Sequence, residues 1–172
     1  MKVNFSDCVS KAVSGDADAF AKLYSLVYKD LYHIALCNLR NSHDAADAVS
    51  VTVLDACASI SKLKDETAFK AWIVKILTVK IKKKQAEYIN NRNNTVEMPD
   101  ESEQKDKRDS FSGLEIAEQI NSLGESERLV FSLSIVCGYS GDEISKMTGI
   151  NPSTVRSHLH RARERLKERL NV

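Results

Sequence analysis

The sequence predicts an all-α protein of two small helical domains joined by a flexible linker. Three observations support this prediction. Apolar residues recur with the 3.6-residue period of a helix, only 6 glycines and 2 prolines occur in 172 residues, and one long internal segment has almost no apolar side chains. So few turn residues argue against a β-sandwich or barrel. We expect domains at residues 1–88 and 114–172, with residues 89–113 as the linker.

The N-terminal domain is predicted to hold four helices. A short amphipathic stretch ends at Ser14-Gly15, and Asp16 can cap the next helix. Ser42 opens a third helix and Asp65 begins a fourth. Their apolar stripes have the spacing of buried faces, and consist of Phe5, Val9, Ala12 and Val13; Phe20, Leu23, Tyr24, Val27, Leu31 and Ile34; Ala45, Val49, Val53, Ala56 and Ile60; and Phe69, Trp72, Ile73 and Ile76.

Residues 89–113 are predicted to stay flexible because they cannot bury enough apolar surface to offset the entropy of ordering. Periodicity returns with a short helix over residues 114–123. A second helix follows, and Gly138 ends it.

The most informative stretch begins at Ser140, which can form a capping box with Glu143. Gly149 is free to adopt the left-handed conformation at a helix end. Asn151 and Pro152 then suit the start of a long final helix. Two helices joined this tightly, the second exposing cations, indicate a helix-turn-helix.

The distribution of charge points to a polyanionic partner. The whole chain carries a net charge of +1, but residues 153–172 hold 6 basic and 2 acidic side chains, and residues 114–152 hold 2 basic and 6 acidic ones. A basic final helix on an otherwise acidic unit is typical of a protein that binds nucleic acid.

The start of the second helix of a helix-turn-helix enters the DNA major groove. With Val155, Leu159 and Ala162 facing inward, we expect DNA contacts from the outer face: Ser153, Thr154, Arg156, Ser157, His160 and Arg161. For the last turns we expect a solvated face, in which Glu164 and Glu168 pair with neighbouring cations.

A second candidate site is the run of lysines in the fourth helix. It lies between Trp72 and Tyr88, and aromatic and cationic side chains together suit single-stranded DNA. A solvated helix face explains the run equally well, and the residue types leave both interpretations open. The candidate contacts are Lys75, Lys80, Lys83 and Lys84.

No catalytic or metal-binding pattern is visible, so we expect neither an enzyme nor a cofactor. The four histidines do not cluster with cysteines or acids at ligand spacing, and no glycine-rich phosphate loop or G-x-S-x-G motif occurs. The four cysteines show no C-x-x-C pair. No stretch is long and apolar enough for a membrane span, and the N-terminus has no signal core, so we expect a cytoplasmic protein.

The C-terminal unit resembles region 4 of the sigma-70 family, in its small extracytoplasmic-function class. The matching residues are Leu123-x-x-x-Glu127-Arg128-x-Val130-Phe131, Gly138-Tyr139-Ser140-x-x-Glu143-Ile144 and Gly149-Ile150-x-x-x-Thr154-Val155-x-Ser157-x-Leu159-x-Arg161-Ala162-Arg163. The N-terminal domain resembles region 2 through Asp18-x-x-x-x-Leu23-Tyr24, Asp44-Ala45-x-Asp47-x-Val49-x-x-Thr52-x-Leu54 and Phe69-x-x-Trp72-Ile73-x-x-Ile76.

The resemblance implies a sigma factor, which binds core RNA polymerase and directs it to promoter DNA. The final helix would read the −35 element, and the Phe69–Tyr88 helix would face the −10 strand. The third helix would dock on the clamp helices of polymerase, through Asp44, Asp47, Ser50, Val51 and Leu54.

The sequence departs from the family pattern at several positions. Ser50-Val51 replaces a common Gln-Glu, Leu77-Thr78-Val79 replaces Ala-Arg-Asn, and Val53 and His158 replace Phe and Arg. The −35 reader is therefore matched better than the other two sites. Two alternatives stay open: a sigma-like DNA-binding regulator that does not support initiation, and a pure interaction protein. Whether an anti-sigma protein also binds is not revealed by the sequence.

Overall fold

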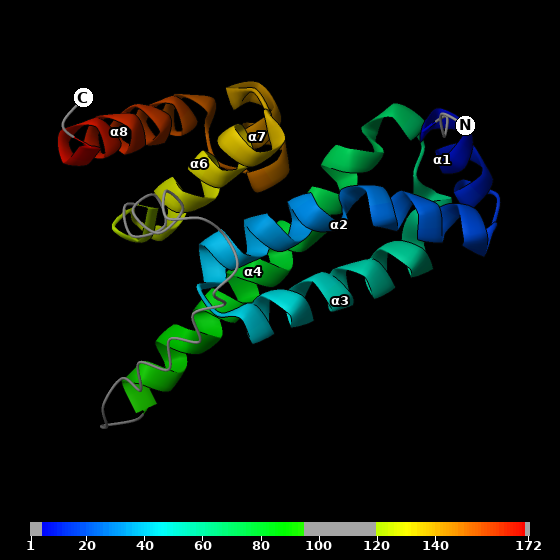
Figure 1. Ribbon diagram of the computed structural model, residues 1–172, viewed down its shortest axis with the longest axis horizontal. Helices are drawn as coiled ribbons and strands as arrows, with labels where there is room; N and C mark the ends of the chain where they lie inside the picture. The colour runs from blue at the N-terminus through cyan, green and yellow to red at the C-terminus, as the bar shows by residue number, and fades with distance from the viewer. Residues whose placement is uncertain (1–4, 95–119, 171–172) are drawn as a thin grey trace.

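The computed structural model describes residues 5–94 and 120–170, and every regular element in those ranges is helical (Figure 1). The N-terminal part contains α1 (Phe5–Val13), α2 (Ala17–Leu39), α3 (Ser42–Ser59), two short 3-10 turns η1 (Ile60–Lys62) and η2 (Glu66–Ala68), and α4 (Phe69–Asn94). The C-terminal part contains α6 (Glu125–Cys137), α7 (Gly141–Thr148) and α8 (Pro152–Leu170). The all-α prediction is confirmed.

Local capping explains where the N-terminal helices begin. The Asp16 carboxylate accepts hydrogen bonds from the backbone N–H groups of Asp18 and Ala19, at 2.9 and 3.0 Å. Helix α3 begins at Ser42, as the sequence predicts, and the residue before it, Asn41, is the cap, since its side-chain oxygen accepts from the Asp44 N–H at 2.9 Å. Asn41 satisfies a backbone donor that would otherwise have no partner at the helix start.

Helix α4 is longer than the sequence predicts. It continues to Asn94, six residues into the segment expected to be linker, and its end extends past the neighbouring helices in Figure 1. The remaining part of the expected linker, and most of the helix expected over residues 114–123, fall outside the described residues.

The helix-turn-helix forms as predicted. Gly138 and Gly149 end α6 and α7 with positive φ angles of 69° and 73°. Ser140 and Glu143 form the reciprocal capping box at the start of α7. The Asn151 side chain accepts from the Ser153 N–H at 3.0 Å at the start of α8, and three residues separate the end of α7 from that start.

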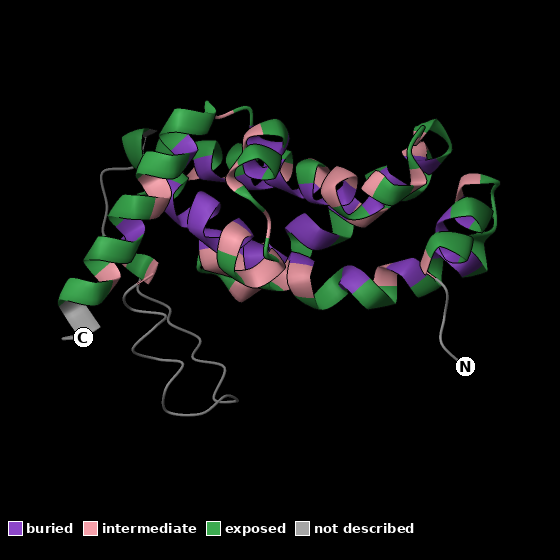
Figure 2. Ribbon diagram, turned by 90° about the horizontal axis from the view of Figure 1, so that it is seen from above, coloured by how far each residue is buried: buried purple, intermediate pink, exposed green. Residues whose placement is uncertain are grey.

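One continuous apolar cluster joins the two parts of the molecule. It includes α2, α3 and α4 residues together with Leu129, Leu133 and Ile144 from α6 and α7. Helix α6 lies against α2, and α7 lies against α4. Figure 2 shows the buried residues on the faces that the helices turn toward one another. No helix in the described ranges has the length and apolar character needed to cross a membrane.

Candidate nucleic-acid interface

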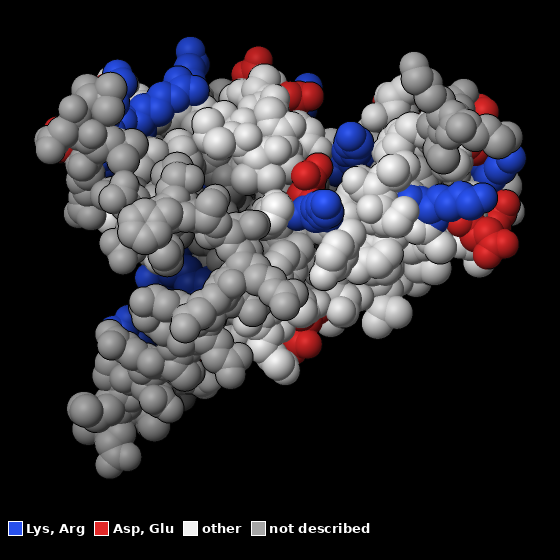
Figure 3. Space-filling model, in the orientation of Figure 1, with Lys and Arg blue, Asp and Glu red and all other residues white. Residues whose placement is uncertain are grey.

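The outer face of α8 is open to solvent, as the sequence predicts. Val155 and Ala162 are fully buried and anchor the helix. All six candidate contacts are exposed: Ser153, Thr154, Arg156, Ser157, His160 and Arg161. Figure 3 shows Lys and Arg side chains gathered over α8 on the visible face. This face combines hydroxyls at a helix N-terminus with guanidinium groups, which suits phosphates and base edges.

Two arginines of α8 are partly engaged by a buried acid. Glu127 of α6 is 6% exposed, and its carboxylate lies 3.0 Å from Arg165 and 3.6 Å from Arg161. Arg165 was expected on a solvated face, but it forms an ion pair with Glu127. Glu127 is one of the residues in the family motif, and no other feature of the sequence indicated this pair. Of the two candidate arginines, Arg161 has an acid beside it, whereas Arg156 has no ion-pair partner among the described residues.

Helix α4 has one face buried in the core and one face open to solvent. Ile73, Leu77 and Ile81 are fully buried in the core. Lys75 and Lys83 are exposed, with Val79 (58% exposed) between them on the same stripe. The solvent face of α4 therefore carries two cations around one apolar side chain.

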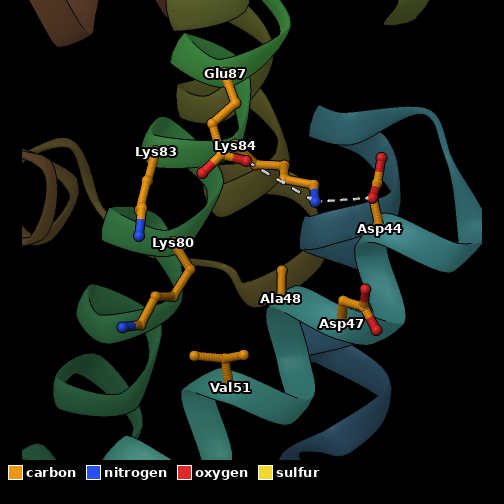
Figure 4. Close-up of a pocket in the computed structure, with 8 residues that line it drawn as sticks. All are labelled: Asp44, Asp47, Ala48, Val51, Lys80, Lys83, Lys84 and Glu87. Atoms are coloured by element: carbon orange, nitrogen blue, oxygen red, sulfur yellow. Dashed lines mark ion pairs between the residues drawn. The ribbon is translucent and has the colours of Figure 1, made fainter.

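The other two candidate lysines of α4 are paired with acids of α3. Lys84 lies 3.1 Å from Asp44, which also accepts a hydrogen bond from the Tyr88 hydroxyl. Lys80 pairs with Asp55. Figure 4 shows Lys84 reaching across to Asp44, while Lys83 points away from α3. The structure thus brings together Asp44 and Lys84, which the sequence assigned to two different partners.

These contacts border a groove of about 440 Å³ between α3 and α4, whose α3 wall includes Ala48 and Val51. Burial alone would raise the pKa of Asp44, but the hydrogen bond from Tyr88 and the proximity of Lys84 outweigh it and lower that pKa. The hydrogen bond to Asp44 raises the pKa of Lys84. Burial, with the Asp44 carboxylate, raises the pKa of Tyr88. Asp44 is therefore held as an anion and Lys84 as a cation.

The side chains on α4 that the family resemblance sets toward the −10 strand differ in how far they are exposed to solvent. Thr78 is 2% exposed, and its hydroxyl donates to the Val74 carbonyl at 2.9 Å. Trp72 is half-buried against the apolar core and packs near Phe69. The Thr78 side chain is therefore closed to solvent, whereas that of Val79 is open to it.

The expected polymerase-binding face of α3 is also largely exposed. Asp47, Ser50, Val51 and Leu54 follow i, i+3, i+4, i+7 spacing and share one stripe, with Leu54 69% and Val51 44% exposed. Asp44 lies beside this stripe, but its carboxylate is already in contact with Lys84 and Tyr88 of α4. Such a stripe, apolar at one end and polar at the other, suits a protein partner.

Metal binding finds little support in these helices. Among the described residues, His43, Asp44 and Asp47 have ligand atoms within 4.8 Å of one another. Asp44 is already bound to Lys84 and Tyr88, and His43 lies 3.5 Å from Asp47 at the surface.

Comparison with known proteins decides the family. The family models for sigma-70 region 2 and sigma-70 region 4 match residues 23–86 and 113–166. The ECF RNA polymerase sigma factor SigW of Bacillus subtilis is 26% identical over 185 aligned positions, which cover 99% of this chain and 98% of that protein. The chain belongs to the extracytoplasmic-function class of the sigma-70 family.

Further proteins that are similar to this sigma factor support the same family. The RNA polymerase sigma factor SigV of Bacillus subtilis is 25% identical over 137 residues, covering 78% of this chain and 80% of that protein. Two solved structures share the fold. RpoE of Bartonella quintana, in complex with the anti-sigma factor NepR, has a TM-score of 0.77 at 22% identity, covering 89% of this chain and 97% of RpoE. CnrH, in complex with the cytosolic domain of CnrY, has a TM-score of 0.70 at 21% identity and covers 97% of both chains.

Proposed function

We propose that this sigma factor binds core RNA polymerase in the cytoplasm and directs it to promoters, without catalysis of its own. The observation that carries the proposal is the exposed face of α8 in a chain whose two parts match sigma-70 regions 2 and 4. In this assignment Ser153, Thr154, Arg156 and Ser157 enter the −35 major groove, with His160 and Arg161 one turn further along.

The −10 strand is assigned to α4. Lys75 and Lys83 on its solvent face would follow the phosphates, while Lys80 and Lys84 would help only if they left their partners on α3. Val79 offers an apolar surface but no hydrogen bond, so we expect α4 to contribute little base preference from that position.

Core polymerase is assigned to the exposed stripe of α3, at Asp47, Ser50, Val51 and Leu54. Asp44 would act there by holding α4 in place. An anti-sigma protein is a further proposed partner, supported by the shared fold with RpoE, which was solved with the anti-sigma factor NepR.

Run-off transcription with reconstituted core polymerase on genomic fragments tests the proposal. Specific transcripts that depend on the protein support a sigma factor. DNA binding without transcripts would instead indicate the regulator that does not initiate, and the absence of both would indicate an interaction protein.

A further inference from the structure

One stripe of α8 joins proposed −35 contacts to a further cation. At i, i+4 spacing the stripe consists of Ser153, Ser157, Arg161 and Arg165. The first three are proposed contacts, and Arg165 continues the same face toward the C-terminus. The side chains of both arginines are roughly half exposed. The stripe therefore has two guanidinium groups with the geometry to bind phosphate.

Both arginines meet the carboxylate of Glu127, a buried side chain in the first turn of α6. Arg165 donates a hydrogen bond to one carboxylate oxygen at 3.0 Å, and Arg161 lies 3.6 Å from the other oxygen. The oxygen that faces Arg165 also accepts from the Gly124 N–H at 3.4 Å. One carboxylate of α6 thus engages two cations of the DNA-facing stripe of α8.

The charge of Glu127 depends on these two partners. Within residues 5–94 and 120–170, Arg161 and Arg165 are the only cations that form ion pairs with it. His158, where the family commonly has arginine, lines the same groove of about 350 Å³. Its buried Nδ1 atom has no hydrogen-bond partner in the described parts of the chain. Because a buried carboxylate without a partner is costly, Glu127 opposes the departure of both arginines.

The two arginines differ in how they are held. Arg165 forms both a hydrogen bond and an ion pair with Glu127, whereas Arg161 forms only the longer ion pair. Arg161 can therefore turn toward a phosphate while Arg165 keeps the carboxylate paired. Even so, this turn weakens an attraction that exists before DNA binds, so a phosphate gains less from Arg161 than from an unpaired arginine.

We propose that Glu127 is a positioning residue that sets the specificity of α8 for DNA. It restrains Arg161 and Arg165, so that these arginines add little to the binding of DNA that lacks a −35 element. The proposal rests on the proposed function of α8. Glu127 acts through the two arginines and has no contact with DNA itself.

Restrained cations favour specific over non-specific binding. Attraction between arginine and phosphate is independent of sequence, and it supplies nearly all of the affinity for random DNA. Base contacts at a −35 element add a term that random DNA lacks. Removing cations from the sequence-independent part therefore lowers non-specific affinity by the larger fraction, and leaves recognition to the first turns of α8.

Glu127→Gln tests the proposal, because the amide keeps the size of the side chain and removes the charge that restrains both arginines. Glu125→Gln is the matched control. It removes the same charge from the same helical turn, at an exposed acid that forms no ion pair within the described residues. The full chain is titrated at several salt concentrations against two probes: a duplex of random sequence, and a −35 duplex from a promoter mapped by run-off transcription.

We expect Glu127→Gln to bind the random duplex about threefold more tightly than Glu125→Gln. Its slope of log affinity against log salt concentration should be steeper by about 0.9 for each arginine released. Affinity for the −35 duplex should rise less, so the ratio of specific to non-specific affinity should fall. A merely structural role of Glu127 would weaken binding and leave the slope unchanged. That result, or equal slopes in Glu127→Gln and Glu125→Gln, would overturn the proposal.

A second variant, Arg161→Gln, keeps Glu127 and its bond to Arg165, and it decides the matter if Glu127→Gln loses helix content by circular dichroism. On the random duplex, Arg156→Gln should make the salt slope shallower by about 0.9. Arg161→Gln should change it by less than half as much, because that arginine is restrained. Equal changes would overturn the proposal. Failure of the proposed function looks different, because Arg156→Gln would then leave the binding of both duplexes unchanged.

Discussion

At the scale of single residues, Asp44 links two surfaces that the sequence treats as separate. Its carboxylate holds Lys84 and Tyr88 of α4 while its own helix carries the proposed polymerase contacts. A cation that is already paired gains less from a phosphate than a free one, because binding must first break the existing pair. The lysines of α4 should therefore contribute unequally to DNA binding.

Replacing Lys83 by alanine should weaken binding of single-stranded −10 oligonucleotides more than replacing Lys84. Each lost phosphate contact should lower the slope of log affinity against log salt concentration by about 0.7. We expect that reduction for Lys83→Ala and Lys75→Ala, and little change for Lys84→Ala. Fluorescence binding at several salt concentrations measures it, and equal slopes for Lys83→Ala and Lys84→Ala would contradict the assignment.

The Asp44 carboxylate should also make stability depend on pH. Its pKa is lowered in the folded protein, so the stability that it provides is present above its unfolded pKa of about 3.9 and is lost as pH falls through the lower folded value. The difference in unfolding free energy between the wild type and Asp44→Asn should thus be larger at pH 7 than at pH 3. Urea unfolding at both pH values measures this.

Asp47→Asn is the control for that experiment, because Asp47 lies on the same helix and has an exposed side chain. A difference for Asp44→Asn that stays constant between the two pH values would show that the pair with Lys84 and Tyr88 does not form in solution.

At the scale of elements, α8 combines an anchored inner face with a free outer face. Val155 and Ala162 hold it against the fold, and Glu127 engages Arg161 and Arg165. Arg156 has no such acid beside it and lies in the first turns, which the proposed function places in the groove. This arrangement makes Arg156 the side chain on which −35 recognition should depend most.

Arg156→Ala should weaken binding to a −35 duplex by about 1–3 kcal/mol and relax the preference at one base position. Arg163→Ala, further along the same helix, should cost less and act evenly on all sequences. Competition binding at fixed salt with single-base variants of the duplex distinguishes the two. Wild-type affinity in Arg156→Ala would rule out its entry into the groove.

The start of α7 depends on its capping box. Ser140→Ala removes the hydroxyl that accepts from the Glu143 N–H, and should lower the unfolding free energy by about 1 kcal/mol. Because α7 packs on α4, the loss should appear in a single transition of the full chain rather than in a separate one. Urea unfolding followed by circular dichroism checks it, with the exposed Ser126→Ala as control; a second, independent transition would argue against the docked units.

At the scale of the whole molecule, local features were predictable and distant contacts were not. The caps at Asp16 and Ser140 and the turn at Gly149 depend on residues within four positions, so sequence patterns reveal them. The pair between Asp44 and Lys84 joins two helices, and the bond between Asn38 and Ser132 spans 94 residues. No periodicity encodes such contacts, because they follow from how complete helices pack.

In the candidate site too, local features could be predicted from the sequence and contacts between distant helices could not. The exposed face of α8 was predictable because Val155, Leu159 and Ala162 define its inner side. The engagement of Arg161 by Glu127 was not, since it requires α6 to lie beside α8. The prediction of two domains separated by a linker also contains no information on whether those domains dock.

The central claim is that one chain reads two promoter elements at the same time, and run-off transcription on spacing variants tests it most directly. Inserting about 5 base pairs between the −35 and −10 elements rotates one element by half a helical turn relative to the other. We predict that initiation from a promoter that this protein recognises is strongly reduced by that insertion, while a template with the parent spacing keeps full activity. Equal transcript from both templates would contradict the claim, because it would show that the two units do not engage the promoter together.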